Sequence, residues 1–313
     1  MRRLQDLRTR QGGFSLIELL VSMTLGLVML GALVSLLSTS LQTNSQTSNS
    51  AQMTEEGGLA LEFLARYVRM AGFSPPLANA SGASVLVNGV QTQAIESDFA
   101  GAGLRGCDGG FTDATAAWES LSCQAGSNPS IALRFQGDLD NTEPSKPDLP
   151  STPALPTDCL AQKITSKAPS IYDATREVTI VEARFTVNSN AELVCGGNGN
   201  GFTAQPLFGN TEGLRISYGL AADGRSTQVL RYVNAANADT LLLADGSSAS
   251  VDQRWSRVVS VKICLVVRAG TPDQSQPTPY VDCDEHTVTP SDKYLRRSIS
   301  TVVTLRNRSA LIQ

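Results

Sequence analysis

The sequence predicts an α+β fold in which one long N-terminal helix packs on an antiparallel β-sheet head that disulfides stabilise. Three observations support this prediction. An apolar run covers residues 14–37, helical periodicity continues to about residue 71, and β-branched runs then alternate with glycine- and proline-rich turns. The first half of the helix would span a membrane, and the β-rich part would carry all the cysteines.

The apolar run at residues 14–37 is long enough, as a helix, to cross a bilayer core of about 30 Å. Glu18 is its one ionisable residue, and a carboxylate within a membrane helix costs roughly 2.5 kcal/mol or more, which usually indicates a function. Residues 1–13 hold four arginines and one aspartate. By the positive-inside rule, this charge places the N-terminus in the cytoplasm and the rest of the chain outside.

This N-terminal pattern resembles the class III signal of type IV prepilins and type II secretion pseudopilins. The resemblance rests on the basic leader, the Gly13-Phe14 junction, the apolar run and the position of Glu18 within it. It implies that a prepilin peptidase cleaves after Gly13 and that Phe14 is then N-methylated. It also implies that Glu18 offsets the N-terminal amine of a neighbouring subunit. The alternative is an ordinary signal anchor that contains an isolated acidic residue. A cleaved secretory signal fits less well, because its apolar region is shorter.

Residues 38–72 are predicted to continue the helix as an amphipathic segment. The first part of this segment is rich in Ser, Thr, Asn and Gln and has poor helix propensity, and apolar residues then recur at helical spacing. Gly57-Gly58 predicts a weak or kinked point. Gly72 would end the helix, so residues 73–313 are expected to form an extracytoplasmic, β-rich head.

Alternating and β-branched runs predict the strands of the head. We expect them at residues 83–87, 130–136, 178–188, 213–220, 227–233, 240–243, 255–268 and 297–306. Asp-Gly turns at residues 223–224 and 245–246 suggest an antiparallel meander. The glycine-dense segments at residues 101–111 and 196–201 are expected to be turns, and the first lacks the flanking strand and helix of a phosphate-binding loop.

The six cysteines indicate disulfides. Their even number, wide spacing and extracytoplasmic position fit up to three bonds, of which we favour the sequence-local set: Cys107–Cys123, Cys159–Cys195 and Cys264–Cys283. A structural zinc site is the alternative, but zinc ligands usually come in closely spaced pairs and no CxxC occurs.

The sequence gives little support for catalysis, and we expect neither an enzyme nor a cofactor. His286 is the single histidine and follows an acidic stretch that resembles a loop, while G-x-S-x-G and HExxH motifs are absent. Asp138-x-Asp140 suggests a calcium loop, but the glycine and the final acid of an EF-hand are replaced by Glu143 and Leu149. A solvated loop is therefore expected, with an irregular calcium site as the alternative.

The head is expected to be acidic. The chain has 25 basic and 29 acidic side chains, and without residues 1–13 it keeps 21 and 28, a net charge of −7. Nucleic-acid binding relies on basic patches. We therefore expect no nucleic acid among the partners.

Two further motifs, together with the large head, resemble the PilW-type minor pilins, whose layout is related to that of the J-type pseudopilins. They are ARYVRMAGF at residues 65–73 and LRRSISTVVTLRNR at residues 295–308. The resemblance implies a minor pilin that waits in the bacterial inner membrane, primes assembly of a type IV pilus and sits at or near its tip on the cell surface. Its partners would be other minor pilins, the major pilin and a PilY-type tip adhesin. The alternatives are a J-type secretion pseudopilin and a ligand-binding or DNA-uptake tip subunit.

Overall fold

The structure is a computed structural model of the 313-residue chain. It describes residues 13, 15–78, 84–87, 90–93, 95–98, 101–147, 149, 151–170, 175–222, 226–242, 246–272 and 276–307. The chain divides into two compact units, Met1–Ser50 and Ala51–Gln313. The boundary falls inside the long helix, so the last part of this helix belongs to the compact head.

Helix α1 spans Leu16–Met70 and passes through Gly57-Gly58 without a break. In the first unit its large apolar side chains are exposed. In the second unit one face is buried, with Met53, Ala60, Leu64 and Val68 at 3% exposure or less. These residues recur at the spacing of one helix face, so packing against the head stabilises this half of α1.

The polar middle of α1 satisfies its hydroxyl groups on the helix itself. Thr39, Thr43 and Thr47 each donate to the carbonyl oxygen four residues earlier, at 2.8–3.0 Å. Such back-bonding pairs the hydroxyls without a partner outside the helix. The segment is helical although its intrinsic helix propensity is low.

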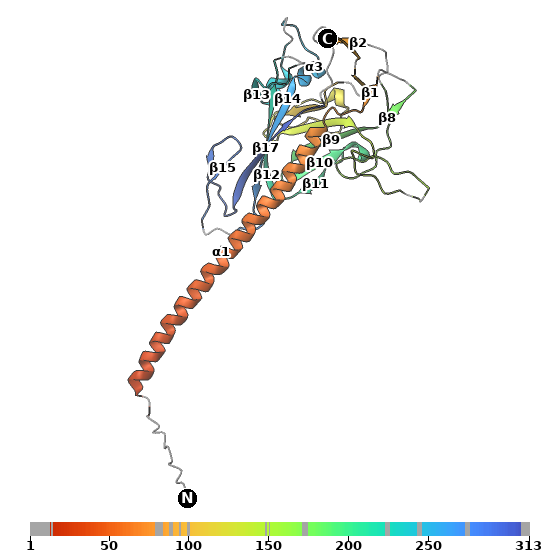
Figure 1. The fold of residues 1–313 in the computed structure, drawn as a ribbon. Coiled ribbons are helices and arrows are strands. Elements are labelled where there is room, and N and C mark those ends of the chain that lie inside the picture. The colour runs from red at the N-terminus through yellow and green to blue at the C-terminus, as the bar shows by residue number, and fades with distance from the viewer. Residues whose placement is uncertain are drawn as a thin grey trace. The chain divides into compact units, whose positions relative to one another are not determined.

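The head contains two main antiparallel sheets (Figure 1). The five-stranded sheet has the order β11-β10-β9-β6-β5, and the four-stranded sheet has the order β13-β12-β14-β17. The strands of the first are β5 (Leu104–Cys107), β6 (Ser130–Gln136), β9 (Ile180–Val187), β10 (Leu193–Gly197) and β11 (Gln205–Phe208). Those of the second are β12 (Thr211–Leu220), β13 (Arg231–Val233), β14 (Val258–Arg268) and β17 (Arg296–Thr304).

Shorter elements complete the described part of the head. The two-stranded pairs are β1 (Pro76–Ala78) with β4 (Ile95–Ser97), β2 (Ser84–Val87) with β3 (Val90–Gln93), β7 (Ala168–Pro169) with β8 (Glu177–Val178), and β15 (Tyr280–Val281) with β16 (Thr287–Val288). The short helices are α2 (Ala235–Asp239), α3 (Val251–Ser256) and the 3₁₀ turns η1 (Trp118–Ser120) and η2 (Asn198–Asn200).

Both sheets and the second half of α1 share one apolar core. Tyr67 of α1 packs against Phe185 of β9, with ring centroids 5.3 Å apart. Tyr218 of β12 meets Trp255 of α3 edge to face, at 5.0 Å. The predicted α+β fold, with one long helix and antiparallel sheets, is therefore confirmed.

The three disulfides link Cys107 to Cys123, Cys159 to Cys195 and Cys264 to Cys283. These are the sequence-local pairs that the sequence analysis favours. The second bond lies in the core, and the third joins β14 to the segment after β15.

The sequence predicts a turn at the glycine-dense segment 101–111, and this prediction is wrong. The segment contains β5, because its glycines allow close packing. A Cβ on Gly106 would lie 1.9 Å from the Tyr218 hydroxyl oxygen, and one on Gly103 would lie 2.0 Å from the backbone nitrogen of Gly72. The segment at residues 196–201 likewise begins inside β10.

Helix α3 replaces the start of the strand predicted at residues 255–268. Trp255 belongs to α3, where the Ser250 hydroxyl accepts from Gln253 N and the Gln253 side chain accepts from Ser250 N. This capping box starts a helix, so the strand begins only at Val258. Residues 240–242 form no regular strand. The meander is also modified, because β14 returns to pair with β12 and leaves β13 at the edge.

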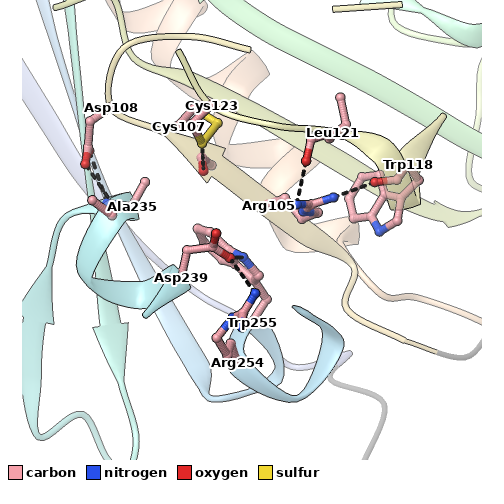
Figure 2. The surroundings of a disulfide bond; sticks show 12 residues. Arg105, Cys107, Asp108, Trp118, Leu121, Cys123, Ala235, Asp239, Arg254 and Trp255 are labelled. Carbon is pink, nitrogen blue, oxygen red and sulfur yellow. Dashed lines mark hydrogen bonds and ion pairs between the residues drawn. A yellow bond between two sulfur atoms is a disulfide. The ribbon is translucent and has the colours of Figure 1, made fainter. Parts of the chain in front are cut away.

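Buried arginines fix the loop at residues 112–121 on the outer side of the five-stranded sheet. Arg105 donates to the carbonyl oxygens of Trp118 and Leu121 at 2.5 and 2.8 Å (Figure 2). Arg184 donates to the carbonyl oxygens of Ala114 and Ala116. Together with the Cys107–Cys123 disulfide and the burial of Trp118 and Leu121, these bonds hold the loop on the sheet.

Candidate functional site

The start of α1 is organised by Ser15 and Glu18. The Ser15 hydroxyl accepts from Ile17 N at 3.3 Å, and the Glu18 carboxylate accepts from Ser15 N at 3.0 Å. Leu16 is the first helical residue, so Glu18 is the third and accepts from the N-cap N–H as in a capping box, while the Ser15 hydroxyl caps the second helical residue. The carboxylate also lies at the positive end of the helix dipole. In the single chain, Glu18 therefore has an internal partner.

The sequence analysis found Glu18 but missed Ser15. The signal was present, since Ser15-Leu16-Ile17-Glu18 has the S-x-x-E spacing of a capping box. Gly13 is exposed, with no atom within 4 Å of a Cβ built on it. Phe14 and residues 1–12 lie outside the described residues.

The apolar part of α1 is unpartnered in the single chain. Large apolar residues from Leu16 to Leu41 are 51–78% exposed. The helix is long and apolar enough there to cross a membrane, by length and composition. The next charged residue after Glu18 is Glu55. A long uncharged helix with this exposure needs an apolar environment, which a bilayer or other helices can supply.

The second unit brings the two short motifs together at the end of α1. Gly72 has a φ of +73°, and its N–H donates to Arg134 O at 2.9 Å. The Asn307 side chain donates to Arg69 O at 2.8 Å and so satisfies a carbonyl of the last helical turn. Residues 65–73 and the end of the chain's last strand thus form one junction, which their separation in sequence conceals.

Further along, α1 packs directly on the four-stranded sheet. A Cβ on Gly57 would lie 2.7 Å from the Ile299 Cδ1 atom of β17. Arg297 of β17 donates to the Thr54 hydroxyl at 3.2 Å. Gly57 is therefore a point of close packing, which explains why the glycine pair does not weaken the helix there.

One cavity of about 220 Å³ lies beside the end of α1. Its wall includes Phe63, Tyr67 and Phe135, and its charged residues are of both signs, with Arg66 against Glu143 and Asp158. Burial, helped by the Asp158 charge, raises the pKa of the Tyr67 phenol. The Asp158 carboxylate is occupied by the N–H groups of Leu160, Gln162 and Gly199. The cavity is thus no basic cleft.

The acidic loops use their carboxylates to form turns. The Asp138 carboxylate accepts from Asp140 N and Asn141 N at 2.9 Å, and the Asp282 carboxylate accepts from His286 N at 2.9 Å. The His286 side chain is 77% exposed. Among the described residues, no three His, Cys, Asp or Glu side chains gather as metal ligands.

Two family models match this chain, one in its C-terminal part and one at its N-terminus. Residues 174–307 match the family model described as Type IV Pilus-assembly protein W. Residues 8–34 match the model described as the prokaryotic N-terminal methylation motif. No curated protein matches the chain.

Among solved structures, a type IV-like pilin from Thermus thermophilus is similar, with a TM-score of 0.40 and 12% identity over 82% of this chain and 96% of that one. The matched methylation motif contains Gly13 and Glu18, and the matched assembly-protein region contains β9 to β17. The chain therefore combines an N-terminal methylation motif with a C-terminal region similar to the PilW family of type IV pilus-assembly proteins.

Proposed function

We propose that the chain is a minor pilin that primes assembly of a type IV pilus and takes a place at or near the pilus tip. The observation that supports this most is the exposed apolar first half of α1, which carries Glu18 in its first turn and continues as one helix into a disulfide-bonded head. The protein would act by assembly and not by turnover.

In this proposal a prepilin peptidase removes residues 1–13, and the new N-terminal Phe14 is N-methylated. Residues 14–37 hold the subunit in the inner membrane, with the head on the far side, and later lie in the filament core. Moving this apolar surface from the bilayer to a helix bundle keeps it away from water. Other minor pilins, the major pilin and a PilY-type tip adhesin are the proposed partners.

Glu18 would change partners during this step. Its carboxylate bonds Ser15 N in the single chain, and in the pilus it would pair with the N-terminal amine of a neighbouring subunit. An ion pair in apolar surroundings is strongly directional because each unpaired charge is costly there. This exchange would set the register of the incoming subunit.

Two substitutions of Glu18 distinguish the role of its negative charge from its role as a cap of the helix N-terminus. Glu18→Gln keeps an oxygen that can accept from Ser15 N, whereas Glu18→Ala removes both the cap and the charge. We expect normal leader cleavage in both variants and a loss of incorporation in both, measured as the amount of the protein in sheared pili relative to membranes. Wild-type incorporation of Glu18→Gln would mean that the cap alone matters and would remove the charge pairing.

Deletion of the gene tests the function itself. One culture gives two readouts, surface pili recovered by shearing and secreted folded exoproteins. We expect pili to be lost while secretion stays normal, and the full-length gene should restore them. Normal pili with failed secretion would replace the proposal by a J-type pseudopilin. Loss of DNA uptake or ligand binding with normal pilus number would instead indicate a specialised tip subunit.

A further inference from the structure

Strand β17 has one edge with no ladder partner among the described residues, and only its start is approached by β15, where the Ser298 hydroxyl donates to Val281 O at 2.8 Å. It pairs with β14 on one side only. Hydrogen bonds from Leu305 N to Val259 O, at 2.9 Å, and from Ala269 N to Leu295 O, at 2.8 Å, fix the phase of this pairing. Because bonded and non-bonded pairs alternate in an antiparallel ladder, the odd-numbered residues of β17 bond to β14. The even-numbered residues direct their N–H and C=O groups away from it.

These outward groups are unpaired within the described part of the chain. They belong to Ser298, Ser300, Val302 and Thr304. The last three residues are exposed, and Val302 is 55% exposed. The run SISTVV at residues 298–303 contains neither charge nor proline. A neutral, β-branched edge of this kind is a template for another strand.

The other edges of the two main sheets are short or protected. β11 has four residues and includes Pro206, which cannot donate to an added strand. β5 also has four residues, and β13 has three. β17 has nine residues. The long unprotected edge therefore differs from the other edges of these sheets.

An open position on α1 borders this edge. Gly58 lies one turn after Thr54, which contacts Arg297 of β17. A Cβ on Gly58 would meet no atom within 4 Å, whereas neighbouring Gly57 is tightly packed. A glycine inside a helix costs about 1 kcal/mol relative to alanine. No described residue packs against this glycine. The helix surface at Gly58 is therefore open to a partner.

The charges at the two ends of the edge indicate which strand fits. Arg297 and Arg306 are exposed, and neither forms an ion pair within the described residues. A strand with acidic residues at its ends would be complementary. A second copy would not be, because residues 295–307 contain no acidic side chain and parallel pairing aligns identical arginines. Like charges opposite each other destabilise a strand pair.

We propose that the outer edge of β17 binds an extended segment of another pilus subunit by strand addition. The segment has a neutral, β-branched or hydroxyl-bearing centre and acidic residues at its ends. Backbone hydrogen bonds to residues 298–304 supply the affinity, and the flanking charges supply the specificity. The inference rests on the proposed function, because that function makes the partner a pilus subunit.

Substitutions at one position separate backbone pairing from side-chain contact. Ser300→Pro removes an outward N–H and leaves the ladder to β14 intact, whereas Ser300→Ala removes only the hydroxyl. In full-length protein solubilised with its pilus subunits, we expect Ser300→Pro to reduce association about tenfold or more, since one net hydrogen bond and the strand geometry are lost. Ser300→Ala should associate like the wild type. Equal loss in both variants, or in neither, would overturn strand addition.

A fold control accompanies these variants. Thr301→Pro removes an N–H that bonds to β14 and should lower the Tm clearly, while Ser300→Pro should stay within a few degrees of the wild type. If Ser300→Pro does unfold, Val302→Lys replaces it, since a lysine on an exposed edge discourages strand addition without changing the backbone. Leu230→Lys, next to the short edge strand β13, is the matched control and should associate normally, because Leu230 is already 70% exposed.

The partner is identified by a photoreactive p-benzoylphenylalanine in place of Val302 in full-length protein in cells. A crosslink to an acid-flanked segment of another pilus subunit supports the proposal, and a crosslink to a second copy of this chain overturns it. Pilus counts then separate the two hypotheses. If deletion abolishes pili but Val302→Lys does not reduce them, the strand-addition proposal fails and the proposed function stands. If deletion leaves pili unchanged, the proposed function itself fails.

Discussion

The Gly13→Val variant is expected to keep its leader and to be missing from pili. The resemblance to prepilins makes Gly13 the residue before the cut, where a branched side chain would have to fit into the active site of the peptidase. The fold itself does not need this glycine, since no atom lies within 4 Å of its Cβ position. Intact mass measurement of the membrane-extracted protein checks the prediction, because it reports both the leader and the N-methyl group.

Gly26→Val is the matched control for this experiment. Gly26 also has no atom within 4 Å of its Cβ position, and it lies in the apolar run after the junction. This variant should be cleaved and methylated normally. Normal cleavage of Gly13→Val as well would contradict the assignment of the junction, and a failure of both variants would point to a defect in membrane insertion.

The Gly103→Ala variant is expected to lose about 3 kcal/mol of unfolding free energy or more, the upper range for overpacking. Its Cβ would lie 2.0 Å from the nitrogen and 2.4 Å from the Cα atom of Gly72. Both are backbone atoms at the end of α1, so no side-chain rotation can relieve the clash. Chemical denaturation of the full-length protein, followed by circular dichroism, measures the change.

The control for this prediction is Gly209→Ala. No atom lies within 4 Å of the Gly209 Cβ position, and surface substitutions of this kind usually change stability by about 0.5 kcal/mol or less. If Gly103→Ala were as stable as Gly209→Ala, the close approach of β5 to the helix end would not exist in solution.

Elements with a clear period could be predicted from the sequence. α1 and β6 were found because apolar residues recur at a fixed spacing, or fill a short run between turns, whatever the rest of the chain does. β5 was missed because Gly103 and Gly106 resemble turn residues locally. Their role depends on Gly72 and Tyr218, which only the folded chain brings close.

One part of the candidate site could be predicted from the sequence, and the other part could not. Gly13 and Glu18 form a local pattern along the chain, and the capping role of Ser15 could have been read from the same four residues. The hydrogen bond from the Asn307 side chain to the carbonyl oxygen of Arg69 could not be predicted, because it joins two motifs that lie far apart in the sequence. The unpaired edge of β17 also depends on the order of strands in the sheet.

The arginine bonds that hold the loop at residues 112–121 should persist in mild acid. The attachments from Arg105 and Arg184 join guanidinium groups to backbone carbonyl oxygens, and neither group changes protonation in mild acid. Acid would weaken the exposed ion pair of Glu119 with Arg134. Burial lowers the pKa of Arg105 and Arg184, but from so high a value that both keep their proton near neutral pH. By contrast, the hydrogen bond with Arg296 holds the pKa of Asp292 at about 2. Strong acid would protonate this carboxylate and break its ion pair with Arg296. This face of the head would therefore keep its shape in surroundings acidic enough to neutralise carboxylates elsewhere on the surface.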